Sequence, residues 1–212
     1  MKRIIIILLC IAAAVLSASC ARGGAGNMPD GGIPIDPDKT AVFETVCSAE
    51  EALMLSRKTD TVVLEENGCT SGKAVWDRFM ETVRNGSPAS VLLAHYYVLD
   101  RERVSEELYE AEKDQYPKLF FYLVSFDGKE YSVKTRESTE KEPDDQAHFA
   151  YLLHFTGKMP STALYASYDK YVLADDPAVT WEEIEKSLIS SQSDAWIRHC
   201  TVYTDYPDRK GD

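Results

Sequence analysis

Residues 118–136 read KLFFYLVSFDGKEYSVKTR, and this stretch decides the predicted fold. Lys118–Phe126 is apolar at almost every position, whereas Lys129–Arg136 alternates apolar and polar residues. Alternation with a period of two is typical of a β-strand. The Asp127-Gly128 pair between the runs suits a tight hairpin turn, which needs residues that tolerate a positive φ. The stretch therefore predicts two antiparallel strands joined by a short turn.

A second long apolar run, Ser90–Leu99 (SVLLAHYYVL), precedes this hairpin. Both of its alternating faces are apolar, which favours a central strand of a sheet. Shorter β-branched or alternating runs predict further strands at Thr40–Val46, Thr61–Leu64, Tyr168–Ala174 and Trp196–Tyr203.

Helices are predicted from capping boxes at Ser48 and Thr180, and from helical spacing of apolar residues elsewhere. They cover Ser48–Leu55, Gly72–Asn85, residues 101–115, Ala147–Phe155 and Thr180–Ser190. Strands and helices do not alternate regularly, so the sequence predicts an α+β fold. We expect one antiparallel sheet of about four to six strands with helices packed mainly on one face. The core side chains expected from the helices are Trp76, Phe79, Ile184 and Leu188.

The first twenty residues have the parts of a bacterial export signal. Lys2 and Arg3 form a basic start, and the apolar run Ile4–Leu16 is shorter than the roughly 20 residues of a membrane-spanning helix. Ser17-Ala18-Ser19-Cys20 then resembles the lipobox of lipoproteins, except that Leu16 stands one position earlier than usual. We expect Cys20 to be lipidated and to anchor the chain at the extracytoplasmic face of the cell membrane. The alternative is an ordinary cleaved signal in which Cys20 is incidental.

The chain divides into four predicted parts. Residues 1–19 are the signal peptide, and residues 20–39 are the lipidated Cys followed by a flexible tether rich in Gly and Pro. Residues 40–206 form a single globular α+β domain, and residues 207–212 form a disordered tail.

The chain is acidic, with a formal charge of −12. A surface of this sign repels phosphate backbones, which argues against a nucleic-acid partner. The predicted partners are the membrane, through the lipid anchor, and a protein or cell-envelope ligand.

No motif of known chemistry is complete in the sequence. Gly68–Lys73 stands between a predicted strand and a helix, as a phosphate-binding loop does, but its glycines are one residue too close and Ala74 replaces the Ser or Thr that binds magnesium. We interpret this segment as a turn that caps the helix. Ser167–Lys170 has the Ser-x-x-Lys pattern of penicillin-recognising enzymes, but it opens a predicted strand and no Lys-Thr-Gly accompanies it.

The four histidines are not spaced as metal ligands on one helix, and the acidic clusters lack the pattern of a calcium loop. The sequence therefore indicates no catalytic residue, metal or cofactor. All twelve tyrosines fall between Tyr96 and Tyr206. They suit either a half-exposed sheet or a binding face, since Tyr offers a rigid ring with a polar tip.

Three cysteines lie in the predicted domain, and an extracytoplasmic location permits a disulfide. We expect Cys69 to pair with Cys200 and so to tie the two ends of the domain together. Cys47 is then a free thiol, with a pKa lowered by the adjacent helix start. The alternative is three reduced cysteines.

Several of these features together resemble a group of small uncharacterised lipoproteins of Gram-positive gut bacteria. They are the lipobox, the tether, Cys-Thr-Ser-Gly before a helix (69–72), Tyr-Pro-Lys-Leu-Phe-Phe before a hairpin (116–121), and Val-Thr-Trp-Glu-Glu-Ile (179–184). The resemblance implies an exported, surface-tethered α+β domain and no catalytic residue. The function we expect is a non-enzymatic binding module. The alternative is a secreted hydrolase or other enzyme whose site is assembled only in the fold.

The lipid anchor leads to a first prediction. Mass spectrometry of the mature protein should find a diacylated Cys20 at the N-terminus and no residues 1–19, because two acyl chains give stable anchoring where one is marginal. A Cys20→Ala variant should lose the acyl mass. A mature N-terminus at Ala21, or an intact Met1, contradicts the prediction.

Overall fold

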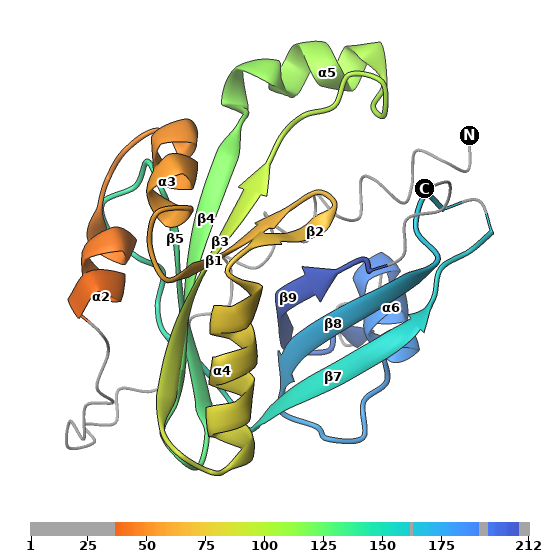
Figure 1. Ribbon diagram of the computed structural model, residues 1–212. Coiled ribbons are helices and arrows are strands. Elements are labelled where there is room, and N and C mark those ends of the chain that lie inside the picture. Colours follow the sequence, from red (N-terminus) through yellow and green to blue (C-terminus); the bar gives the residue numbers. More distant parts are fainter. Residues whose placement is uncertain (1–36, 162, 191–194, 208–212) are drawn as a thin grey trace.

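The computed structural model describes residues 37–161, 163–190 and 195–207 (Figure 1). Its helices are α2 (Pro37–Glu44), α3 (Ala49–Ser56), α4 (Lys73–Arg84), α5 (Glu106–Glu112), the 3-10 turn η2 (Lys113–Gln115) and α6 (Trp181–Ile189). Its strands are β1 (Thr61–Glu65), β2 (Gly68–Ser71), β3 (Ala89–Tyr97), β4 (Lys118–Phe126), β5 (Tyr131–Glu137), β6 (Ala147–Phe149), β7 (Tyr151–Lys158), β8 (Ser167–Ala174) and β9 (His199–Asp205). No helix among the described residues is long and apolar enough to cross a membrane.

The strands form two sheets, which confirms the α+β class. The larger has six strands in the order β2-β1-β3-β4-β5-β6, and only β1 and β3 run parallel. The smaller is antiparallel, in the order β7-β8-β9. The predicted hairpin is confirmed as β4 and β5, and the side chain of Asp127 accepts hydrogen bonds from the backbone N–H groups of Lys129 and Glu130 across the turn.

Helices cover both faces of the larger sheet, whereas we expected them mainly on one. On one face, α2 and α3 pack on alternate residues of β3 and β4, including Leu92 and Phe121. On the other face, α4 packs on the intervening residues, including Leu93 and Val124 (Figure 1). A strand that is apolar on both faces requires cover on both, and this explains why β3 is central.

The smaller sheet lies between α4 and α6 (Figure 1). Tyr171 and Leu173 of β8 join the core around Trp76, whereas Val172 and Ala174 face Ile184 of α6. The predicted helix at Thr180 is confirmed with its capping box, but it packs on this second sheet and not on the first.

For two segments, the predicted type of secondary structure is wrong. Ala147–Phe155 is not a helix but β6 and most of β7. This run is apolar at most positions, so its pattern fits a strand as well as a helix, and pairing with β5 and β8 decides between them. Thr40–Val46 is not an edge strand but the end of α2 and the following loop. Because α2 begins at Pro37, residues 37–39, which we assigned to the tether, are helical.

Arg136 of β5 is charged, yet it is only 1% exposed. Its guanidinium donates only to backbone carbonyls, among them Phe43 O at 2.6 Å and Thr45 O at 2.7 Å, and it lies against the ring of Phe121. A buried charge is tolerated when all its hydrogen bonds are satisfied. Arg136 therefore holds the chain after α2 against the larger sheet.

Trp76 leads to a prediction about stability, since it is 1% exposed and touches both sheets. Trp76→Ala should lower the free energy of unfolding by about 3–5 kcal/mol through lost burial and the cavity left behind. Urea titration followed by circular dichroism measures the change. Met54→Ala, at a side chain that is mostly exposed, is the control and should shift it by no more than about 0.5 kcal/mol. Equal midpoints for the two variants would show that the core lies elsewhere.

Candidate functional site

The two sheets meet at a seam where β2 and the start of α4 lie beside β9 (Figure 1). Gly68 permits this approach, and Gly72 permits the close approach of the start of α4 to β1. A Cβ on Gly68 would lie 2.4 Å from a carboxylate oxygen of Asp205, and a Cβ on Gly72 would lie 2.3 Å from Thr61 O. Both glycines have a positive φ. The segment that we interpreted as a capping turn is thus a short strand, and Gly72 caps α4 without any side-chain hydrogen bond.

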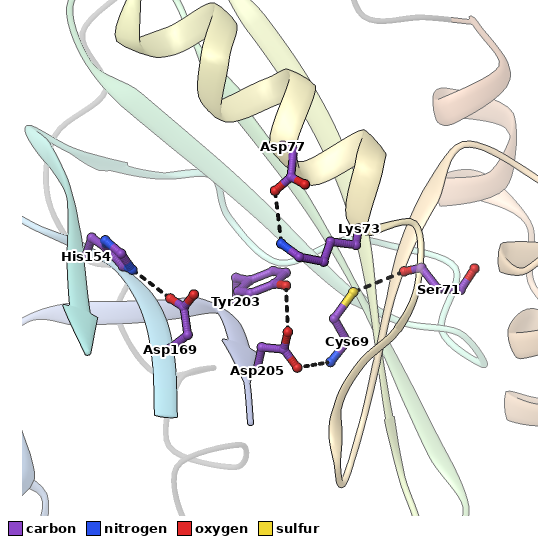
Figure 2. A network of polar contacts seen from close by, with 8 residues as sticks. All are labelled: Cys69, Ser71, Lys73, Asp77, His154, Asp169, Tyr203 and Asp205. Atoms are coloured by element: carbon purple, nitrogen blue, oxygen red, sulfur yellow. Dashed lines mark hydrogen bonds and ion pairs between the residues drawn. The ribbon is translucent and has the colours of Figure 1, made fainter. Parts of the chain in front are cut away.

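A network of polar side chains lines this seam (Figure 2). One oxygen of the Asp205 carboxylate accepts a hydrogen bond from the backbone N–H of Cys69 at 3.2 Å, and the other accepts one from the Tyr203 hydroxyl at 3.4 Å. The Cys69 thiol donates to Ser71 O at 3.3 Å. Lys73 lies above them and is paired with Asp77 at 3.1 Å.

A second polar pair lies on the same side of the smaller sheet (Figure 2). His154 Nε2 is 2.7 Å from a carboxylate oxygen of Asp169, and its ring stacks on Tyr171 at 4.3 Å. Asp169 is the cross-strand partner of Asp205. Two carboxylates in facing positions repel each other, and the hydrogen bonds that each receives offset this cost.

The seam moves pKa values away from neutrality. Burial raises the pKa of the Cys69 thiol, and a hydrogen bond from Tyr203 only partly opposes it. Burial, followed by the charges of Cys69 and Asp205, raises the pKa of Tyr203 far above that of free tyrosine. Burial alone would lower the pKa of Lys73, but the hydrogen bond and charge of Asp77 raise it overall. A general acid or base works best with a pKa near the working pH, so these three groups are poorly suited to that task.

The predicted Cys69–Cys200 disulfide is not formed in the structure, where both residues are free thiols. Cys69 lies beside Asp205 of β9, and Cys200 precedes Asp205 by five residues in β9. Five residues of strand span about 15 Å, well beyond the roughly 7 Å that a disulfide can bridge. Burial raises the pKa of Cys200 to about 12. Cys47 is also free, but burial and the charge of Glu51 raise its pKa, contrary to our expectation.

The remaining sequence candidates do not assemble into a catalytic centre. Within the described residues, no three His, Cys, Asp or Glu side chains are arranged to hold a metal ion. His95 is buried in β3 and His199 is partly buried at the start of β9. Ser167–Lys170 begins β8, a strand and not a helix. Cys20 lies outside the described residues.

A tyrosine-lined groove of about 310 Å³ lies between α3, the end of β3 and α5. We call it the tyrosine groove; it is lined by Glu50, Tyr96, Val98, Leu99, Tyr109, Lys113, Tyr116 and Pro117. Its walls come from α3, the end of β3, α5 with η2, and the residues before β4. The helix α5 stands beyond the ends of β3 and β4 and buries none of its residues (Figure 1).

The abundance of tyrosines is evident from the sequence, but the groove that three of them line is not. The available signal was local: a tyrosine pair at the end of a predicted central strand, and Tyr116-Pro117 at the start of the next one. A second hollow, of about 220 Å³ beside α4, has Phe79 as its one aromatic lining residue and contains the ion pair of Arg78 with Asp60.

Comparisons of the chain with protein-family models, with curated proteins and with solved structures find no significant match.

His95 leads to a prediction about pH. Its Nε2 donates to Val202 O at 3.1 Å and so links the two sheets, and burial lowers its pKa from 6.5 to about 4. Between these values the unfolded chain binds a proton that the folded chain does not, so stability is present above pH 6.5 and is lost as the pH falls toward 4. Compared with His95→Gln, the native protein should lose about 2–3 kcal/mol more of its unfolding free energy between pH 7.5 and 4.5.

Urea titrations at several pH values measure this difference. Met54→Ala, at a mostly exposed side chain that carries no titratable group, serves as the control and should keep the native pH dependence. Burial also lowers the pKa of the partly buried His199, so some pH dependence should remain in His95→Gln. Parallel curves for the native protein and His95→Gln contradict the prediction.

Proposed function

We propose that this protein is an exported lipoprotein, anchored through Cys20, whose globular domain binds a protein or cell-envelope component outside the cytoplasmic membrane. The observation that carries the binding role is the tyrosine groove. Three tyrosines from separate segments, Tyr96, Tyr109 and Tyr116, line one hollow together with apolar residues. Tyrosine is enriched in binding surfaces because its ring is rigid and amphipathic, so little conformational entropy is lost on binding.

The position of the groove supports this role. It lies at the ends of β3 and β4, and its outer wall α5 has no buried residue. Val98, which lines it, is 52% exposed. Covering an exposed apolar side chain with a partner removes it from water and is therefore energetically favourable.

The chemistry of the polar seam argues against the alternative of a secreted hydrolase and so favours a binding role. Its thiol, phenol and amine have pKa values raised away from neutrality, and the Cys69 thiol is held protonated by burial. An activated nucleophile needs the reverse, a lowered pKa or an adjacent base. We therefore assign the seam a structural role in joining the two sheets.

Site-specific photocrosslinking in cells that produce the protein tests the binding role. p-Benzoylphenylalanine placed at Val98 should give a discrete adduct, because this side chain lines the groove. The same probe at Ile189 of α6, which is 63% exposed but lies on the other sheet, is the matched control and should give none. Adding Tyr109→Ala should reduce the Val98 adduct at least severalfold. Equal labelling from both positions, or none from Val98, overturns the proposal.

A further inference from the structure

Among the described residues, no cation lies over one of the three tyrosine rings of the groove. Arg101 lies over the ring of Tyr109 at 5.4 Å, and Lys118 lies over the ring of Tyr116 at 5.6 Å. Aromatic faces attract cations through the ring quadrupole. Within the described residues, the third ring, Tyr96, has no such neighbour. It is therefore the ring available to a cation from outside.

Carboxylates surround the tyrosine hydroxyls. Burial raises the pKa of Tyr96, and the charges of Glu50 and Glu65 raise it further. Burial and the charge of Glu112 act on Tyr116 in the same way. Glu50 and Glu112 make no ion pair with another described residue, and Glu50 lines the groove directly.

Two cations near the groove, Lys113 and Arg57, are neutralised by partners within the protein. Lys113, the one basic residue of the lining, is 2.5 Å from Glu110. Arg57, whose charge also reaches Tyr96, is 2.5 Å from Glu65. Glu50 thus remains as the carboxylate beside Tyr96 that lacks a counter-charge.

The segment that forms the outer wall of the groove is also negatively charged. Residues 100–118 contain seven Asp or Glu and four Lys or Arg, a net charge of −3. A negative field over an aromatic hollow attracts positive ligands and repels anionic polymers.

We propose that the tyrosine groove binds a lysine or arginine side chain, presented by an extended segment of a protein partner. The cation lies over Tyr96 and pairs with Glu50, and the neighbouring part of the segment packs on Val98, Leu99 and Pro117. This inference rests on the proposed binding function and names the chemistry of its ligand. An uncharged glycan could also stack on tyrosine rings, but it would leave the charge of Glu50 unmatched.

The test uses residues 20–212 with Cys20→Ser, so that the full mature chain is present without its lipid. Four probes are titrated, with amide chemical shifts near Glu50, Tyr96 and Val98 as the readout. They are N-acetyl-arginine amide, its neutral analogue N-acetyl-citrulline amide, the anionic N-acetyl-glutamate amide, and chitotetraose. We expect the arginine amide alone to give saturating shifts, with an affinity that falls as salt is added.

Glu50→Gln should weaken the binding of the arginine amide about threefold to fivefold, as expected for the loss of one exposed ion pair. Glu185→Gln on α6 removes the same charge far from the groove and should have no effect. Because Glu50 is exposed, neither variant should alter folding. Tyr96→Phe keeps the ring and should retain binding, whereas Tyr96→Leu should lose most of it.

The outcomes separate this inference from the proposed function. Equal binding of the arginine and citrulline amides, or binding of chitotetraose alone, overturns the cationic ligand but leaves a binding groove. Shifts unaffected by Glu50→Gln also overturn the cationic ligand. If no probe shifts the groove residues, the cationic ligand is wrong, and the absence of a crosslink at Val98 then removes the binding function as well.

Discussion

The structure depends on the packing of one indole ring between two sheets. Trp76 projects from α4, stacks on Tyr203 at 4.6 Å and meets Tyr171 edge-on at 5.1 Å. These tyrosines belong to the smaller sheet, while α4 packs on the larger one. The smaller sheet is also joined to the larger one by the crossing from β6 to β7, by the contacts of β1 and β2 with β9, and by the hydrogen bond of His95 with Val202 O. The indole N–H has no hydrogen-bond partner among the described residues, so its contribution comes from packing.

The polar groups of the seam are a consequence of this packing. Once Trp76 brings β9 beside β2, the backbone N–H and C=O groups along the edges of both strands need hydrogen-bond partners. Asp205 provides one by accepting from the backbone of Cys69, and His95 provides another by donating to Val202 O. On the far face of the larger sheet, Arg136 has the same role for the carbonyl groups that follow α2. Asp205, His95 and Arg136 therefore complete backbone hydrogen bonds where segments meet.

The tyrosine groove is built under a different constraint, because it lies outside both cores. The strands β3 and β4 extend past the neighbours that cover them, and α5 bridges their ends without burying a residue. Ring–cation contacts and surface ion pairs hold this region, and each of them is weak. Such a region can accommodate a ligand at little cost to the two cores, and this separation of stability from binding is expected of a recognition module.

The elements that the sequence determined by itself are those whose information is local. The Asp127-Gly128 hairpin, the capping boxes at Ser48 and Thr180, and the apolar stripe of α4 each depend on residues within a few positions of one another. Lipidation at Cys20 is also an inference from a local pattern, and it stays a prediction.

Only the tertiary structure decided the elements whose pattern is ambiguous or whose partners are distant in the chain. The apolar run Ala147–Phe155 suits either helix or strand, and its pairing with β5 and β8 selects strands. The separation of Cys69 from Cys200 follows from the register of β9 beside β2, which no spacing in the sequence reveals. The groove joins residue 50 to residues 96–117. Turns and caps form from interactions between near neighbours, whereas sheet partners, thiol distances and binding hollows depend on long-range packing, which the order of residues along the chain specifies only through the complete fold.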